Sequence, residues 1–371
     1  MEVLNRLGAL RQQRGISAVA LAKAAGVSRQ TIYAIEAGSY VPNTAVALRL
    51  ARELASTVEE LFTLPDPEPP ALKRAQAALL PGSDDLEAGQ PVQLCRVANR
   101  LIASPPSPVP WYIPASDAIA AARPTEAGKL NVEIHFDDPT FENRILIAGC
   151  DPGISILARH TQAAGVELVL AHRNSSQALE LLKSNCVHIA GAHLRDEPSG
   201  ESNVPAITRM FPKNSVAVIS FALWEEGIVT APGNPKQIRS IEDLARPDVK
   251  LINREAGAGS RLLLDSSLER AHIEASRVKG YAQTAPGHLA AAWQVRTGAA
   301  DCCIATGVSA RIYGLSFTPL VSERYDLVIR RQHLDLPAVQ ALLDTLNRAR
   351  FRRELESIGG YDMKPAGQRV I

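Results

Sequence analysis

Residues 21–38 have the sequence LAKAAGVSRQTIYAIEAG, and this stretch decides the fold of the N-terminal part of the chain. Its small and apolar residues recur at helical spacing, which predicts helices over residues 18–25 and 29–37. A serine precedes each helix as a cap, and Gly26 and Gly38 supply the left-handed residues that end them. Two short helices joined by such a tight turn are typical of a helix-turn-helix.

The second helix presents the candidate DNA-reading residues Ser28, Arg29, Gln30 and Tyr33 from its first turns. Residues at the N-terminal end of a recognition helix contact base edges. A glutamine amide can pair with adenine through two hydrogen bonds, and an arginine suits guanine or a phosphate group. For any one of these residues alone, an ordinary solvated helix face is the simpler explanation.

The remainder of residues 1–64 extends the motif into a compact all-α module of four or five helices. This module resembles the Cro/repressor-type (XRE) helix-turn-helix family. The residues that carry the resemblance are Ala22, Gly26, Val27, Ser28, Ile32, Ile35, Glu36, Gly38, Pro42 and the closing Leu61-Phe62. The resemblance implies a double-stranded DNA operator as partner and a structural role for Glu36.

The N-terminal module is only mildly basic. Residues 1–64 contain seven Lys or Arg and five Asp or Glu, so their formal charge is +2, and the remaining residues sum to −1. Neutralisation of phosphates supplies most of a protein's affinity for DNA, so a monomer with this charge binds weakly. We therefore expect a homodimer whose recognition helices lie about 34 Å apart on a two-fold site.

A Pro/Ala-rich segment, residues 65–90, is expected to link this domain of residues 1–64 to a second domain of residues 91–371. The prolines of residues 65–70 exclude a helix and favour an extended backbone. The Ala-rich residues 71–80 are expected to form a short helix.

From residue 143 onward, strands and helices alternate. Residues 144–150 (RILIAGC) form a continuous apolar run, which is typical of a strand buried on both faces. Further strands are expected at residues 166–171, 186–190, 216–219, 227–230, 250–252, 301–305 and 327–329. Their alternation with helices predicts βαβ units around a parallel sheet.

The stretch LINREAGAGSR, residues 251–261, ends a strand and begins a helix through small residues. A helix N-terminus with free amides attracts anions, and Arg254 and Arg261 can add charged donors. Such junctions gather at the carboxyl ends of parallel strands, where ligands bind. A plain connection, with each arginine in a structural salt bridge, remains the alternative.

From about residue 144 to 371 the sequence resembles the periplasmic-binding-protein-like domain fused to cytoplasmic helix-turn-helix modules and to molybdopterin biosynthesis proteins. The matching stretches include AGCDPG (148–153), IAGAHLRD (189–196), INREAGAGSR (252–261) and YDLVIRR (325–331). The resemblance implies a type II α/β fold of two lobes that close on a small anionic ligand, such as molybdate, tungstate or a pterin-type molecule related to the molybdenum cofactor. The ligand-binding residues that it implies are Asp151, Ser175, Ser176, His193, Asn253, Arg254, Ser260, Arg261, Thr284 and Thr306.

The two resemblances together predict a multidomain, ligand-responsive, sequence-specific transcription regulator. No GxSxG, HExxH or P-loop motif is present, so we expect no catalysis and no cofactor. His188 and His193 are five residues apart and point alternately, which argues against a joint metal site, and Cys302-Cys303 is interpreted as buried filler. A molybdenum-cofactor-handling enzyme or carrier with an autoregulatory DNA-binding module is the alternative. An antitoxin-like interaction protein is disfavoured by the large second domain.

Composition sets the remaining limits. The chain has 371 residues, a net charge of +1 and five cysteines without a CxxC pair, which argues against a disulfide framework or a zinc knuckle. No apolar run approaches the roughly 20 residues that span a bilayer, and the N-terminus lacks the plan of a secretory signal. We therefore expect a cytoplasmic protein without a membrane partner.

Overall fold

The computed structural model describes residues 3–63, 73–83, 85–106, 113–124, 128–135, 141, 143–196 and 200–371. The chain divides into two compact units, residues 1–71 and 72–371, and each is described by itself. The proline-rich residues 65–70, for which an extended backbone is expected, lie outside the described residues. Among the described residues, no helix is long and apolar enough to cross a membrane.

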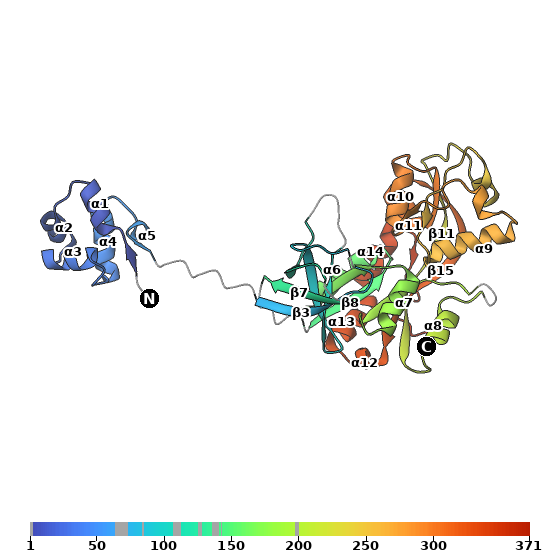
Figure 1. The fold of residues 1–371 in the computed structure, drawn as a ribbon, viewed down its shortest axis with the longest axis horizontal. Coiled ribbons are helices and arrows are strands. Elements are labelled where there is room, and N and C mark those ends of the chain that lie inside the picture. Colours follow the sequence, from blue (N-terminus) through green and yellow to red (C-terminus); the bar gives the residue numbers. More distant parts are fainter. Residues whose placement is uncertain are drawn as a thin grey trace. The chain divides into compact units, whose positions relative to one another are not determined.

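The first unit is a bundle of short helices, as the sequence predicts (Figure 1). Its helices are α1 (Leu7–Gln13), α2 (Ala18–Ala25), α3 (Arg29–Glu36), α4 (Thr44–Glu53) and α5 (Val58–Leu61). Ser17 and Ser28 cap α2 and α3, and Gly26 ends α2 with a φ of 69°. One feature was not expected: strand β1 (Leu4–Asn5) pairs with β2 (Phe62–Thr63) and joins the two ends of the unit.

The core of the first unit is one apolar cluster in which Leu7, Leu21, Ile32, Leu50 and Leu61 are fully buried. Burial of each such side chain contributes about 1.5–3 kcal/mol. Ile32 comes from α3, Leu21 from α2 and Leu50 from α4. The cluster therefore anchors one face of α3, and the opposite face of α3 is exposed to solvent.

The second unit begins with a closed five-stranded barrel in the order β3-β5-β4-β6-β7. Its strands are β3 (Lys73–Leu79), β4 (Pro91–Val97), β5 (Arg100–Ser104), β6 (Ala118–Ala120) and β7 (Lys129–Ile134). The predicted linker over residues 65–90 is therefore wrong from residue 73 onward, and the helix predicted over 71–80 is a strand. Ala77 and Leu79 alternate with more exposed neighbours and are buried in the barrel, so tertiary pairing overrides the helical preference of the alanines.

A mixed sheet follows the barrel, in the order β14-β11-β15-β10-β8-β9, with β16 (Tyr361–Asp362) paired to β11. Its other strands are β8 (Arg144–Gly149), β9 (Glu167–His172), β10 (Ile189–Ala192), β11 (Val216–Thr230), β14 (Cys302–Thr306) and β15 (Ser316–Arg330). Strand β8 is fully buried and pairs in parallel with β9 and β10, as the sequence predicts. The other pairs of this sheet are antiparallel. Parallel pairing recurs at the other end, where Leu251 bridges Cys302 and Asn253–Arg254 pairs with Thr284–Ala285, so the predicted parallel pairing holds at both ends.

Two long strands cross from one end of the sheet to the other. Residues 216–219 and 227–230 were expected to be separate strands, but both belong to the fifteen-residue strand β11. It pairs with β15 along its length, with irregularities between Ser220 and Ala222 and between Glu226 and Gly227. In its middle, the buried Glu226 faces the site and Glu225 faces solvent, and these two charged residues interrupt the apolar pattern of the sequence.

We call the end built around β8–β10 lobe one and the end built around β12–β14 lobe two. The helices of lobe one are α6 (Ile154–Gln162), α7 (Ser175–Lys183), α8 (Val204–Met210), α12 (Arg331–Leu334), α13 (Pro337–Leu346) and α14 (Ala349–Ile358). Lobe two contains β12 (Asn253–Arg254), β13 (Thr284–Ala285), α9 (Gly259–Arg270), α10 (His288–Arg296), α11 (Gly307–Ile312) and the 3₁₀ helices η2 (Glu242–Ala245) and η3 (Ala275–Arg277). Figure 1 shows α9–α11 gathered at the far end of β11 and β15 from α12 and α13. The predicted two-lobed α/β fold is confirmed.

Candidate functional site

The exposed face of α3 carries the predicted DNA-reading residues. The Ser28 hydroxyl caps the helix by accepting a 3.0 Å hydrogen bond from the backbone N–H of Thr31. Arg29 donates to the Tyr33 hydroxyl from Nε at 3.2 Å and Nη2 at 3.0 Å, and Gln30 is exposed. Glu36 instead binds Arg11, with Nε 2.6 Å from Oε1, which fits the structural role expected for it.

A cluster of buried side chains lies where the two lobes meet. Cys150 follows β8, His193 follows β10 and His288 is the first residue of α10. The Sγ atom of Cys150 is 3.5 Å from Nε2 of His193 and 3.9 Å from Nε2 of His288. All three residues are 3% exposed or less. The two imidazoles come from opposite lobes, and each directs its Nε2 atom toward the Cys150 sulfur.

The other ring nitrogen of each histidine faces a carboxylate from a crossing strand. Glu323 of β15 accepts a 2.8 Å hydrogen bond from Nδ1 of His193. Nδ1 of His288 lies 3.5 Å from Oε1 of Glu226 on β11 and 3.5 Å from Oγ of Ser260, which donates to the same Glu226 oxygen. These contacts fix the orientation of both rings.

The carboxylates strongly affect the protonation of this cluster. Burial, reinforced by the nearby Glu323, raises the pKa of Glu226 to about 8. Burial alone would lower the pKa of His193, but its contacts with Cys150, Glu323 and Glu226 hold it well above the usual value. Burial and the charge of Arg254 lower the pKa of His288 well below its usual value.

Asp151 lies beside this cluster, directly after Cys150. Its Oδ1 atom accepts hydrogen bonds from the backbone N–H of Gly153 and, at 2.9 Å, from the hydroxyl of Tyr361. Burial raises the pKa of Asp151 to about 7 in spite of these bonds. Its second oxygen, Oδ2, has no hydrogen-bond partner among the described residues.

Arg254 approaches the cluster from lobe two. It is 1% exposed and pairs through Nε and Nη2 with the two carboxylate oxygens of Glu255, at 3.0 and 3.1 Å. The remaining nitrogen, Nη1, is buried without a partner in the described part of the chain. Trp224 adds a second such donor, Nε1, and its ring lies 5.1 Å from that of His193 and 5.6 Å from that of His288.

Glycines of the junction at residues 251–261 allow lobe two to approach lobe one closely. A Cβ atom at Gly259 would lie 2.4 Å from the backbone oxygen of His193, and one at Gly257 would lie 3.2 Å from the side chains of Asn174 and Ser176. Asn174 also donates a 3.1 Å hydrogen bond to the carbonyl of Ala256. The small residues of this loop therefore permit contact between the lobes.

The structure brings together Asp151, His193, Arg254 and Ser260 among the predicted ligand-binding residues. Ser175 supports them, because its hydroxyl accepts a 3.0 Å hydrogen bond from the backbone N–H of His193. Ser176 is half-buried at the contact with Gly257.

The other predicted residues have local contacts instead. Asn253 donates to the Tyr281 carbonyl, and the buried Thr306 hydroxyl bonds with Ser309. Arg261 stacks on the Tyr281 ring at 4.2 Å and donates a hydrogen bond to the Arg254 carbonyl, so it helps to hold the backbone of Arg254 in position. Thr284 is exposed on β13.

Sequence reasoning missed Cys150, Glu226, His288 and Glu323. Cys150 and His288 each stand at a strand-to-helix junction that the sequence shows, within AGCDPG and APGH. No sequence motif pointed to Glu226 or Glu323, because the strand segments that contain them were not predicted. His188, considered with His193, instead contacts His333 at a ring distance of 5.0 Å, and Cys302 and Cys303 are buried as expected.

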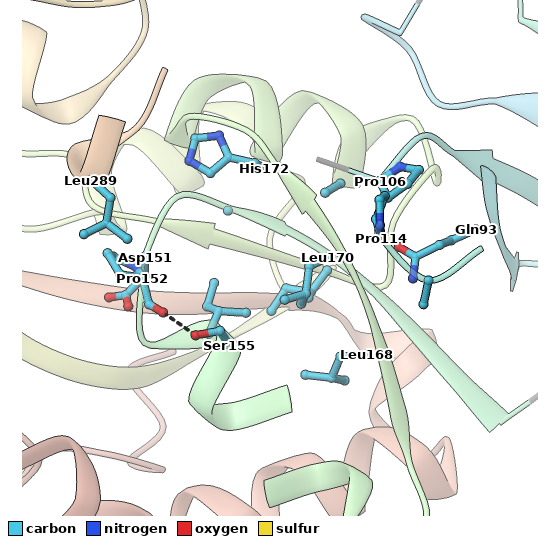
Figure 2. A pocket seen from close by; sticks show the side chains of 15 residues that line it. Gln93, Pro106, Pro114, Asp151, Pro152, Ser155, Leu168, Leu170, His172 and Leu289 are labelled. Atoms are coloured by element: carbon cyan, nitrogen blue, oxygen red, sulfur yellow. Dashed lines mark hydrogen bonds between the residues drawn. The ribbon is translucent and has the colours of Figure 1, made fainter. Parts of the chain in front are cut away.

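A pocket of about 430 Å³ reaches the site from one side. Figure 2 shows Asp151 and Leu289 at one side of this pocket, with Gln93 and Pro114 at the other. Leu289 belongs to lobe two, Asp151 to lobe one and Gln93 to the barrel. The pocket thus lies where all three parts of the second unit meet, next to the buried cluster.

Comparison with known proteins agrees with this architecture. Residues 7–61 match the helix-turn-helix family HTH_3, and residues 158–347 match the PBP superfamily domain. The protein YvgK of Bacillus subtilis is 30% identical over 252 residues, which cover 67% of this chain and 81% of YvgK.

Two further similarities concern single domains. The HTH-type transcriptional regulator YgzD of Bacillus subtilis is 38% identical over 60 residues, 16% of this chain and 91% of that protein. A phosphate ABC transporter substrate-binding protein from Clostridium perfringens, solved with bound phosphate, aligns at 14% identity with a TM-score of 0.44, covering 59% of this chain and 98% of that one. A structural similarity of this size has no bearing on the ligand.

Proposed function

Because this chain belongs to the PBP superfamily and carries an XRE-type helix-turn-helix domain at its N-terminus, we propose that it is a transcription regulator whose affinity for a DNA operator is controlled by a small ligand bound between its lobes. Ligand binding would favour the closed arrangement of the lobes. A ligand changes the affinity for DNA only if it binds one arrangement better than the other.

The observation that carries this proposal is a set of buried polar atoms at the site that have no hydrogen-bond partner among the described residues. They include the acceptors Asp151 Oδ2 and Glu226 Oε2 and the donors Arg254 Nη1 and Trp224 Nε1, from both lobes and the crossing strands. Each buried polar atom without a partner costs about 1–3 kcal/mol. A ligand that pairs with these atoms removes that cost in the closed arrangement, whereas water can solvate them when the lobes open.

The ligand class is constrained by the same atoms. Molybdate or tungstate, which the sequence resemblance suggests, can accept hydrogen bonds from Arg254 and Trp224. An oxyanion would also meet Asp151, Glu226 and Glu323, and anion binding therefore requires that Asp151 and Glu226 be protonated. The raised pKa of both groups, about 7 and about 8, makes that state accessible near neutral pH.

DNA binding is proposed for the exposed face of α3, with Ser28, Arg29, Gln30 and Tyr33 as contacts. The N-terminal unit carries little net positive charge, so we propose that two copies bind a two-fold operator as a homodimer. Light scattering of the full chain with and without operator DNA tests this point, and a monomer in both states would contradict it.

The experiment that tests the regulator begins by selecting binding sites for the full chain from a random DNA pool. The affinity for the selected site is then measured by fluorescence anisotropy with molybdate, tungstate, pterin compounds and divalent metal ions. We expect one ligand to change the affinity and the replacement Trp224→Phe to weaken that response. Trp293→Phe, on the exposed face of α10, is the matched control. Failure to select any DNA site would contradict the proposal.

A further inference from the structure

We propose that Cys150, His193 and His288 bind one transition-metal ion with an affinity for sulfur, such as Zn²⁺, at the contact between the two lobes. This proposal deepens the function proposed above and rests on it in one respect, that binding at this site changes the affinity for DNA. The ion would be the effector, or the group that holds the effector.

The distances between the donor atoms fit such an ion. Typical zinc bonds are about 2.3 Å to sulfur and about 2.0 Å to nitrogen, which place the two donors about 3.5 Å apart at the tetrahedral angle and about 3.7 Å apart at 120°. The observed separations from Sγ of Cys150 are 3.5 Å to His193 Nε2 and 3.9 Å to His288 Nε2. Ligand atoms of the three residues all lie within 4.8 Å of one another.

The partners of the second ring nitrogens support the same assignment. Metal-binding histidines usually donate their other N–H to a carboxylate or carbonyl, which fixes the tautomer and leaves the first nitrogen free to coordinate. Nδ1 of His193 bonds Glu323 at 2.8 Å, and Nδ1 of His288 lies 3.5 Å from both Glu226 and Ser260. Each Nε2 is therefore the available ligand atom, and each faces Cys150.

The buried carboxyl groups of the site can also balance the charge of a metal ion. Asp151, Glu226 and Glu323 are each at most 5% exposed, and the nearby guanidinium of Arg254 is already paired with Glu255. Buried carboxylates are usually paired with cations or coordinated to metals. A divalent ion that replaces the protons of the cluster would be balanced by these carboxylates.

The second imidazole distinguishes a metal site from a nucleophilic cysteine. A catalytic Cys-His-Glu arrangement needs one imidazole to take the thiol proton and one carboxylate to orient it. Here two imidazoles approach the same sulfur, each with a carboxylate behind it. Three protein ligands also leave the fourth position of a tetrahedral ion for an exogenous donor.

Metal binding would link the lobes directly. Cys150 and His193 belong to lobe one, and His288 belongs to lobe two. On binding, the Cys150 thiol and the Nε2 atom of the His193 imidazolium each lose a proton to solvent. The Cys150 sulfur and both Nε2 atoms then form bonds to the ion. The ion thus replaces a separable contact between lobes with coordinate bonds, which favours the closed arrangement.

The test uses the full chain, stripped with a chelator and kept reduced, titrated with Co²⁺ and then with Zn²⁺. We expect one Co²⁺ per chain, with a thiolate-to-cobalt charge-transfer band and the intense visible bands of a tetrahedral ion, all removed by one equivalent of Zn²⁺. Absence of the thiolate band in the wild-type protein would overturn the proposal without any variant.

Two substitutions locate the ion. Cys150→Ser should remove the thiolate band, and His288→Asn should weaken Co²⁺ binding by more than the roughly 10–100-fold that loss of a carboxylate partner costs. The matched controls are Cys303→Ser, at a buried cysteine of lobe two, and His272→Asn. His272 is exposed, and its backbone φ is 56°. A band that survives in Cys150→Ser, or disappears equally in Cys303→Ser, would overturn the assignment.

DNA binding separates this inference from the proposed function. Stoichiometric Co²⁺ binding through Cys150 with unchanged DNA affinity would uphold the metal site and contradict control by it. A change in DNA affinity with an oxyanion or a pterin, in a protein that binds no Co²⁺, would uphold the regulator and overturn the metal site.

Discussion

Glu323 accepts a 2.8 Å hydrogen bond from Nδ1 of His193, and this contact joins a strand that crosses between the lobes to an imidazole at their interface. The carboxylate lies on β15, which runs through both lobes, and His193 follows β10 of lobe one. A change in the crossing strand would therefore move or release the imidazole.

Replacing Glu323 by Gln should weaken Zn²⁺ binding by about 10–100-fold, because an amide oxygen is a weaker acceptor and makes the imidazole less basic. The dissociation constant is measured by competition with a chromophoric chelator. Glu225→Gln, an exposed position on the neighbouring strand β11, serves as the control. Equal affinity in the two variants would show that Glu323 does not position His193 for the ion.

The free energy of unfolding of the metal-free protein should fall as the pH rises from about 6.5 to about 8. Asp151 and Glu226 have pKa values of about 7 and about 8 in the folded protein, and both ionise near pH 4 in the unfolded chain. Over this range the folded state binds more protons, so raising the pH costs stability, on the order of 2 kcal/mol. The raised pKa of His193 acts in the same direction, and the lowered pKa of His288 matters only below about pH 6.5.

Urea denaturation at the two pH values measures this difference. In Glu226→Gln the dependence on pH should be smaller, since one of the two titrating carboxylates is gone, whereas Glu225→Gln should behave as the wild type. Stability that rises between these pH values would contradict the protonation states described here.

Oxyanion and metal binding should depend on pH in opposite directions. An oxyanion requires protonated Asp151 and Glu226, so molybdate should bind more tightly at about pH 6 than at about pH 8. A metal ion competes with protons for Cys150 and His193, so Zn²⁺ should bind more tightly at the higher pH. Calorimetric titration at both pH values measures the affinities for molybdate and for Zn²⁺. Molybdate affinity that increases with pH would exclude direct contact with these carboxylates.

Gly259→Ala should prevent full closure of the lobes and weaken ligand binding. The added Cβ would lie 2.4 Å from the backbone oxygen of His193 and 2.5 Å from its ring, and a backbone atom cannot move aside cheaply. Gly307→Ala is the matched control, because Gly307 also begins a helix of lobe two and the nearest neighbour of its added Cβ would be the Phe317 ring, at 3.1 Å. Co²⁺ affinity and thermal unfolding are measured for both. Normal affinity in Gly259→Ala would mean that the ligand does not need the close contact.

Gln30→Ala should weaken binding to the selected operator by about 1–3 kcal/mol if the amide pairs with an adenine. Gln13→Ala, exposed at the end of α1, is the control. Fluorescence anisotropy with operator DNA and with random DNA measures the specific and the non-specific affinity of each variant. A loss that is equal on both DNAs would assign Gln30 to the phosphate backbone instead.

The parts of the fold that the sequence predicts best are those whose local signals agree with their tertiary environment. Caps, glycines and apolar spacing place α2 and α3 almost to the residue, and the apolar run at residues 144–150 identifies β8. Strand β3 was mistaken for a helix because alanines pack as readily in a barrel as in a helix. The middle of β11 was missed because Trp224 and Glu226 face a polar site that interrupts the apolar run.

The candidate site was predicted in part for a similar reason. Asp151, His193, Arg254 and Ser260 lie within stretches that resemble a known family, and the structure brings them together. Glu226 and Glu323 are separated by nearly a hundred residues and are joined only by the pairing of β11 with β15. Arg261, from the same stretch as Arg254, lies over the Tyr281 ring.

Strand β3 closes the barrel by pairing with β7 along its length and with β5 at its end. A chain shortened to begin at residue 91 would lose this strand and leave two unpaired strand edges, which are templates for aggregation. Any attempt to transfer the second unit to a different reporter or DNA-binding module should therefore make the fusion before residue 73. A fusion placed by the proline and alanine content of the sequence alone would cut through a folded barrel and yield an insoluble biosensor.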